Sequence, residues 1–430
     1  MLPATGKTSH LRSGPRAVSA LAPRLSHGST RRRFLRLTGA ASAGAAVHVP
    51  GARAEGPGHD EKAASAGPLT MSLCGDVMLG RGIDQILPYP SDPELHEPYA
   101  RSATTYVALA EAAHGPIPRP VDHAYVWGDA LDTLRRLEVP VRIINLETSI
   151  TVSDDFAPKG INYKMHPANA RVLTLAGIDC CVLANNHVLD WGQAGLRETL
   201  DTLEQAGIPS AGAGRNAEQA AAPAIVQASG ARVLVFAFGA ASSGIPHDWA
   251  AKADRPGINL LPDLSEEAVA HVAARAERVR RPGDLLVASI HWGGNWGYEI
   301  PPAQTAFAHG LIDEAGFDVI HGHSSHHPKA IEIYHGRPVL YGCGDFLNDY
   351  EGITGKEEFR GDLAMMYLPV FHAGGDLRAF PLEVFQIRKF RLQRASPEDA
   401  RWLQATLDRE SRKFGTRVEW GGDHRLTVRW

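Results

Sequence analysis

The sequence predicts a layered α/β fold, and two observations support this prediction. Nearly continuous apolar segments of strand length alternate with amphipathic segments of helical period, which is typical of buried strands joined by helical crossovers. Groups of polar residues follow five of the predicted strands directly, where open α/β sheets place their ligand crevice. The chain has 430 residues and is 44% hydrophobic, enough for one large or two ordinary domains with a core.

The N-terminal 54 residues differ from the rest of the chain. The segment Thr30–Arg36 contains consecutive arginines and precedes a weakly apolar Ala/Gly-rich run, which predicts a twin-arginine export signal. Ala52-Arg53-Ala54 has the small-x-small pattern of a signal peptidase site, so we expect the mature chain to begin near Glu55. The run is short for a membrane about 30 Å thick, and an uncleaved anchor is the alternative. We therefore expect a signal peptide at 1–54, a linker at 55–68, and a periplasmic or other extracytoplasmic location.

Charge and cysteine content exclude several classes of protein. Without residues 1–54 the chain has 35 basic and 48 acidic side chains, a formal charge of about −13. A net-acidic surface argues against nucleic acid as a partner. The cysteines stand in apolar, strand-like stretches without a CxxC pair, so we expect small buried residues, not a disulfide framework or zinc finger. They are Cys74, Cys180, Cys181 and Cys343.

Strands and helices are expected to alternate through the first three quarters of the chain. Apolar runs predict strands at 69–74, 141–147, 179–185, 232–237, 284–291 and 317–321. Helical periodicity predicts helices at 127–137, 169–176, 193–205, 266–280 and 303–315. The segment 88–124, rich in Pro, His and acidic residues, is expected to be an irregular insertion.

The C-terminal third predicts hairpins. One joins 330–334 to 338–342 across a Gly-containing turn, and another joins 363–371 to 380–387 across Gly374-Gly375. We therefore expect a mostly parallel first part and a more antiparallel second sheet. Together they make one domain over residues 69–390, followed by a helix and tail at 391–430.

The first three polar groups combine carboxylates, amides and an imidazole. Asp76 ends the first strand, where a carboxylate capping a turn is the structural alternative. Alternation places Asn145 and Glu147 on one face of their strand, so one or both could face the crevice. After the next strand come Asn185, Asn186, His187 and Asp190. Polar residues beside a buried strand are costly unless hydrogen-bonded or bound to a metal, which favours a functional role.

The other two groups are rich in histidine. His291 ends a strand and is followed by aromatic residues and Glu299; the aromatic residues could line a pocket or pack under a loop. Four imidazoles then occur within seven residues, at His321, His323, His326 and His327, a density typical of metal ligation. Imidazoles combined with Asp, Glu and Asn oxygens suit Mn, Fe or Zn ions. The number of ligands would suffice for two bridged metals that activate a water, while a spare His protonates the leaving group.

In order and spacing, these motifs resemble those of the CapA/PgsA proteins of poly-γ-glutamate capsule synthesis, in the calcineurin-like metallophosphoesterase superfamily. The resemblance covers about residues 69–350. It is carried by Gly75-Asp76 with Met78 and Arg81, Asn145-Leu146-Glu147, Asn185-Asn186-His187 with Asp190 and Gly192, His291-Trp292-Gly293 with Glu299, Gly322 to His327, and Tyr341 to Phe346. It implies a four-layer α/β/β/α sandwich of two mixed sheets, with a metal site between the sheets.

The resemblance also implies roles for individual residues. The implied metal ligands are Asp76, Glu147, Asn186, His291, His323 and His326. The implied catalytic set has His187 as proton donor and Arg81 as anion clamp, together with Asp190 and Glu299. Met78 stands where classical phosphoesterases have a histidine, so one metal position is expected to be weak or empty. Asp345 adds a carboxylate near the site, and His327 could replace either of the last two ligands.

We therefore expect an exported CapA-like protein that takes part in the synthesis, export or processing of an anionic capsule polymer. It would use one or two divalent metal ions in a phosphoesterase-like, metal-dependent hydrolase site. The expected partners are an anionic polymer or phosphorylated substrate and capsule synthesis membrane proteins. Two alternatives stay open: a stand-alone metal-dependent phosphoesterase or hydrolase, and a non-catalytic scaffold subunit of a capsule complex.

Overall fold

The computed structural model describes residues 67–422 and 425–430. The predicted signal peptide and most of the predicted linker lie outside the described residues. Within them, no helix combines the length and apolar character that a membrane span requires.

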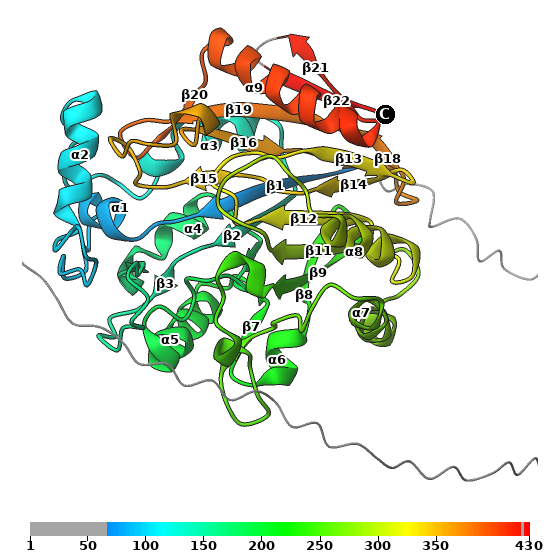
Figure 1. Ribbon diagram of the computed structural model, residues 1–430, viewed down its shortest axis with the longest axis horizontal. Coiled ribbons are helices and arrows are strands. Elements are labelled where there is room, and N and C mark those ends of the chain that lie inside the picture. The colour runs from blue at the N-terminus through cyan, green and yellow to red at the C-terminus, as the bar shows by residue number, and fades with distance from the viewer. Residues whose placement is uncertain (1–66, 423–424) are drawn as a thin grey trace, which may run out of the picture. The chain divides into compact units, whose positions relative to one another are not determined.

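The first sheet is built around strand β1 (Leu69–Val77), which lies near its centre (Figure 1). On one side β1 continues into the parallel strands β2 (Val141–Leu146), β5 (Cys180–Val182) and β6 (Ser210–Ala211). On the other side the order is β16 (Leu363–Tyr367), β19 (Pro381–Ile387), β22 (Arg425–Arg429) and β21 (Arg417–Gly422), each antiparallel to its neighbour. Further short strands join this sheet: β15 (Asp345–Leu347), β17 (Val370–Phe371), β18 (Leu377–Ala379) and β20 (Leu392–Arg394).

The second sheet is also mixed. Its centre is parallel, in the order β14 (Arg337–Leu340), β12 (Val319–His323), β11 (Leu285–His291) and β9 (Ala231–Gly239). Antiparallel strands β13 (Ile331–Tyr334) and β8 (Ala224–Ala228) form its two edges. Two small ribbons lie outside both sheets: β3 (Ser149–Ile150) with β4 (Lys164–Met165), and β7 (Ala213–Gly214) with β10 (Gly257–Ile258).

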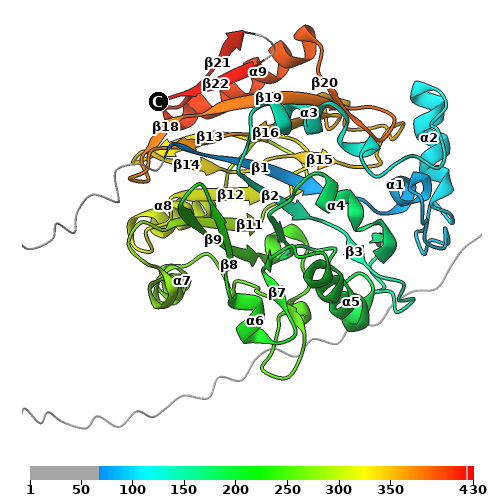
Figure 2. The ribbon, with the colours of Figure 1, turned by 180° about the vertical axis from the view of Figure 1, so that it is seen from behind.

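Helices cover the outer faces of both sheets. Buried side chains of α3 (Gly128–Arg136), α4 (Arg171–Leu175) and α5 (Gly192–Gln205) share a cluster with one face of the first sheet. Those of α7 (Glu266–Val279) and α8 (Pro302–Asp313) cover the second sheet. Both views show α4 and α5 on the side of β2, and α7 and α8 on the side of β9 and β11 (Figures 1 and 2). The remaining helices are α1 (Arg81–Ile86), α2 (Thr104–His114), α6 (Ala217–Ala221) and α9 (Pro397–Ser411).

The core between the sheets follows from strand alternation. Leu69, Met71 and Leu73 of β1 pack in the same cluster as Val235 and Val287 of the facing sheet. Intervening positions of the strands face the helices. The architecture is therefore the four-layer α/β/β/α sandwich of two mixed sheets that the resemblance implied.

The structure corrects the expected division between a parallel first part and an antiparallel second sheet. Because β16, β19 and β22 extend the sheet of β1, while β14 joins that of β11, each sheet contains both orientations. The insertion at 88–124 is also not wholly irregular, since α2 occupies a run of good helix formers within it.

The predicted C-terminal tail is a hairpin that belongs to the first sheet. Strand β22 pairs with β19, and the alternating residues Val418, Leu426 and Val428 are fully buried. The helix α9 adds Leu403 and Leu407 to the same inter-sheet cluster. The expected strand at 179–185 is shorter than predicted, because the backbone leaves the sheet after Val182 and Asn185 then donates to the Leu146 carbonyl.

Candidate metal centre

The polar residues expected at strand ends meet between the two sheets. In register, Asp76 of β1 lies opposite Asn145 of β2 and Asp345 of β15. On the facing sheet, His291 of β11 lies opposite His323 of β12. Parallel strands end at the same edge of a sheet, so these side chains converge although they come from distant parts of the chain.

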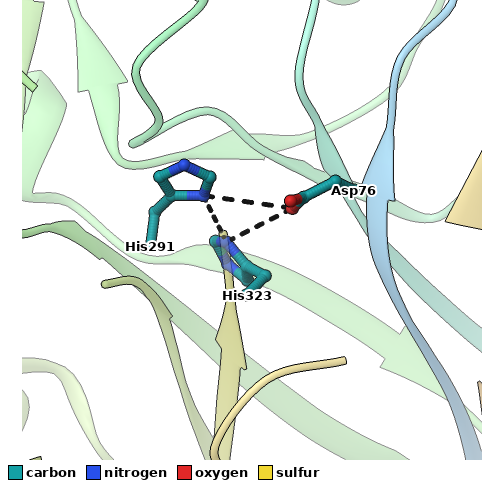
Figure 3. Close-up of side chains that lie close together, drawn as sticks. All are labelled: Asp76, His291 and His323. Atoms are coloured by element: carbon teal, nitrogen blue, oxygen red, sulfur yellow. Dashed lines mark hydrogen bonds and ion pairs between the residues drawn. The ribbon is translucent and has the colours of Figure 1, made fainter. Parts of the chain in front are cut away.

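Asp76, His291 and His323 form a first group whose ligand atoms all lie within 4.8 Å of one another (Figure 3). Asp76 Oδ1 is 3.9 Å from His291 Nδ1 and 3.8 Å from His323 Nδ1. The two Nδ1 atoms are 2.8 Å apart. All three residues are buried, and the two imidazoles and one carboxylate make the mixed N/O donor set that transition metals prefer.

A second group shares Asp76 and adds His326 and Asp345. His326 Nδ1 lies 3.0 Å from Asp345 Oδ1, and Asn348 donates to the other oxygen of Asp345 at 2.8 Å. Asp76 thus has candidate partners on two sides. Asp345 was expected only as an additional carboxylate near the site, whereas the pairing of β15 with β1 makes it a full member of this group.

Glu147 and Asn186 lie near Nε2 of His291, the ring nitrogen that does not face Asp76 and His323. His291 Nε2 is 3.0 Å from Asn186 Oδ1 and 3.6 Å from Glu147 Oε1, while Nδ1 faces the first group. Four of the six predicted metal ligands, Asp76, His291, His323 and His326, belong to the two candidate groups, while Glu147 and Asn186 lie at the other ring nitrogen of His291. In the ring orientation described, His291 separates Glu147 and Asn186 from Asp76 and His323.

Negative charge in the centre is buried and poorly compensated. Burial, followed by the neighbouring Asp345, raises the pKa of Asp76 to about 8. Burial and the carboxylate of Asp76 likewise raise the pKa of Glu147 well above its usual value. Burial lowers the pKa of His326, but Asp345 and Asp76 outweigh it, so that its pKa is raised overall. Carboxylates desolvated in this way favour a bound cation, and the donor set fits a divalent metal ion.

His187 belongs to a separate hydrogen-bonded unit beside the centre. Its Nδ1 is 2.6 Å from Asp190 Oδ2, and the same carboxylate accepts the Tyr163 backbone N–H at 2.7 Å. Tyr163 stacks on the His187 ring at 3.9 Å between centroids. Because Asp190 accepts the Nδ1 proton, Nε2 of His187 is the nitrogen left for a substrate.

Lys159, which no sequence pattern indicated, completes this unit. Its Nζ donates to Asp190 Oδ1 at 2.7 Å and to the carbonyl oxygen of Asn186. It thereby connects both ends of the loop that carries Asn186 and His187. The segment 151–163 is mostly without regular secondary structure, so no periodicity could have indicated it, and only its proximity in space identifies Lys159.

Arg81 and Glu299, two of the predicted catalytic residues, occupy positions that do not fit the roles expected of them. The guanidinium of Arg81 is buried and forms ion pairs with both Glu97 and Asp349, so its charge is already neutralised within the protein. It lines the pocket with its face, against the ring of Tyr106 at 3.8 Å. Glu299 is exposed in the loop after β11 and is not among the residues that line the pocket. The structure does not bring Glu299 into the site.

His321, His327 and the four cysteines do not belong to the candidate metal groups. His321 contacts Ser289 and the Cys74 carbonyl at 3.0 Å each. His327 packs against Tyr298 and Phe359, with its Nδ1 at 3.1 Å from the Pro328 carbonyl. It belongs to neither candidate group. All four cysteines lie in the described part of the chain, and they are buried free thiols.

A pocket of about 400 Å³ opens in front of the centre. Its lining combines candidate ligands and the His187 unit with an aromatic wall. The candidate ligands are Glu147, Asn186 and His326, and the unit beside the centre contributes His187 and Lys159. The wall includes Tyr99, Tyr106, Tyr163, Trp296 and Tyr350. Of the predicted ligands, Glu147, Asn186 and His326 line this pocket beside His187, whereas Asp76, His291 and His323 are not among its lining residues.

Known proteins resemble this chain along most of its length. The family model described as bacterial capsule synthesis protein PGA_cap matches residues 70–350. A probable polyglutamine synthesis accessory protein of Mycobacterium tuberculosis is 50% identical over 364 residues, which are 84% of this chain and 96% of that protein. The PGA biosynthesis protein CapA of Bacillus subtilis is 25% identical over 359 residues, 82% of this chain and 81% of that protein.

Among solved structures, a 5'-nucleotidase precursor from Thermus thermophilus aligns with 79% of this chain, at 16% sequence identity and a TM-score of 0.39. This chain spans 57% of that protein.

Proposed function

Because the chain belongs to the family of bacterial capsule synthesis proteins, we propose that it is an exported accessory protein of an anionic capsule polymer. It acts in the synthesis, export or processing of a polymer of the poly-γ-glutamate type, through a metal-dependent hydrolytic site. The observation that carries the chemistry is the convergence of buried carboxylates and imidazoles around Asp76. Such a set is unfavourable in a purely structural role and fits divalent metal ions.

Some of these residues would bind the metal ions, and others would transfer a proton. Asp76, His291 and His323 would hold one ion, and His326 with Asp345 would offer a second position that also uses Asp76. A divalent ion bound there would supply Lewis acidity for the hydrolysis of an ester or amide bond. His187 lines the pocket, and its Nε2 would first accept a proton from water and then pass that proton to the leaving group. Asp190 holds the tautomer of His187 through Nδ1, and Lys159 fixes Asp190.

Metal content and turnover test this proposal. Protein purified without chelators is expected to contain a transition metal, and chelation is expected to lower its thermal stability. His187→Ala is expected to keep the metal but to lose turnover of an aryl phosphate or of the polymer by about 10²- to 10⁴-fold. The matched control is His271→Ala, at an exposed position on α7. Metal-free protein whose stability does not respond to chelation would refute the proposal.

Export is the second part of the proposal, and it rests on the arginines before the apolar run in residues 1–54. Arg31→Lys combined with Arg32→Lys is expected to leave unprocessed protein in the cytoplasm, as judged by cell fractionation. Arg12→Lys with Arg16→Lys changes the same residue type outside the motif and should leave export intact. Normal export of the first double variant would contradict the twin-arginine route.

A further inference from the structure

A second cavity, also of about 400 Å³, lies beside the pocket of the metal centre. Trp296, Tyr350 and Ile353 line both cavities, so the two cavities are neighbours. Each cavity alone is within the size range that holds a small organic ligand. Together they offer room for a molecule much longer than a single ester or one amino-acid residue.

The boundary between the two cavities is open to solvent on one side. Ile353 is 52% exposed, and it lies in the exposed segment 352–358 that forms one wall of the second cavity. Gln386 and Ile387 at the end of β19 also line this cavity. A chain bound at the metal centre can therefore continue past Trp296 and Ile353 without entering the protein core.

The second cavity has one cation that is free to receive an anion. Among the described residues no carboxylate pairs with Lys356, whose Nζ lies 5.9 Å from the centroid of the Trp296 ring. Arg360, in contrast, is engaged by Asp362 and Asp399.

The acidic residues of this cavity are already hydrogen-bonded within the protein. Glu351 accepts the backbone N–H groups of Lys389 and Phe390, and Glu357 accepts that of Gly355. Asp362 accepts from Arg360 and Gln386. An incoming carboxylate would therefore find Lys356 as its partner.

We propose that the second cavity is a subsite for an extended, carboxylate-bearing chain whose reacting bond lies at the metal centre, with Lys356 as the residue that recognises a carboxylate. This inference rests on the proposed function and specifies where its polymer would bind beyond the reacting bond. The enzyme holds several consecutive units of the chain, with the aromatic side chain of Trp296 at the crossing between the two cavities.

The test compares short and long probes on the full exported protein with its native metal. Isothermal titration calorimetry measures binding of a γ-linked glutamate dimer and a γ-linked glutamate decamer. Thr354→Trp adds bulk at an exposed position of the second cavity, and Lys356→Gln removes its free charge. Matched controls are Thr174→Trp on α4 and Lys252→Gln, both exposed and outside the two cavities.

In the unchanged protein, the decamer is expected to bind about tenfold tighter than the dimer, because it fills both cavities. Thr354→Trp should abolish that difference, and Lys356→Gln should weaken the decamer about two- to fivefold, an effect that salt suppresses. Dimer binding should be the same in all variants. Equal binding of dimer and decamer, or an unchanged decamer affinity in both variants, overturns the subsite alone. Failure of the unchanged protein to bind either probe overturns the glutamate polymer of the proposed function, and the subsite with it.

Discussion

At the scale of single residues, Asp76 has the most demanding position in the molecule. It is fully buried, it accepts Asn145 Nδ2 at 2.7 Å and the Ser324 backbone N–H at 3.2 Å, and it belongs to both candidate metal groups. The two hydrogen bonds do not offset its desolvation, since its pKa stays raised. Loss of this one carboxylate should therefore affect every metal position at once.

Elemental analysis of three variants tests the role of Asp76. Asp76→Ala is expected to remove all bound metal. His323→Ala and His326→Ala are each expected to remove metal from one group only, leaving about half of a two-ion content. Asp132→Ala, an exposed carboxylate on α3, is the control and should keep the full content. Complete metal loss in both histidine variants would show that the two groups act as a single site.

His321 gives a prediction for the pH dependence of stability. Burial lowers its pKa to about 4, although a hydrogen bond with the Cys74 carbonyl raises the pKa in part. Between about pH 6.5 and pH 4 the unfolded chain binds a proton at this residue and the folded protein does not. His321 therefore costs stability as the pH falls through this range, by at most about 3 kcal/mol, and has no such effect above it.

Urea unfolding of the chelated protein at several pH values measures this effect. Compared with the unchanged protein, His321→Gln should lose less stability between about pH 6.5 and pH 4, because Gln does not titrate. Chelation in both samples prevents metal release from contributing to the slope. Parallel curves for the two proteins would show that His321 is not the group responsible.

At the scale of elements, the C-terminal helix and hairpin are part of the fold. Helix α9 begins with Ser396 accepting the Asp399 N–H at 3.1 Å, and its buried leucines pack between the layers. Strand β22 covers the edge of β19, whose backbone groups would otherwise be exposed to pairing with other chains.

Deletion of residues 397–430 tests this structural role. Among the described residues it removes five Leu and Val side chains that are fully or nearly fully buried, each contributing about 2 kcal/mol. Their sum is comparable to the whole stability of a typical domain. The lost side chains are Leu403, Leu407, Val418, Leu426 and Val428. The truncated protein is expected to aggregate and to show no cooperative thermal unfolding. Deletion of Trp430 alone, which is 53% exposed, is the control and should leave the unfolding temperature nearly unchanged.

At the scale of the whole molecule, the sequence predicted the strand ends better than the arrangement of the sheets. Apolar runs ending near Asp76, Asn145 and His291 left a local pattern of strand ends, and the structure places these three side chains close together. Sheet order depends on pairing between distant segments, and nothing local shows that β15 or β22 joins the first sheet. The sequence predicted the hairpins, but it did not predict which of the two sheets each hairpin joins.

The same distinction explains the residues of the site that were misplaced or missed. Glu299 lies near a motif in sequence, but the loop that carries it turns its side chain to solvent. Arg81 lies in the pocket, yet its partners Glu97 and Asp349 could not be inferred from spacing. Lys159 has no pattern around it, and it acts only because the 151–163 segment folds back onto the loop at Asp190.

The pairing that places Asp345 beside Asp76 also sets the time at which the centre can form. Asp76 accepts a hydrogen bond from Ser324, which lies 248 residues later in the chain. Strand β15, which pairs with β1, comes after Ser324 in the sequence. Contacts of such long range close slowly, because the intervening chain must be ordered first. A nascent chain that has not yet released β15 from the ribosome has no complete ligand set. Metal binding would then be one of the last events of folding, and it would distinguish folded molecules from incompletely folded ones.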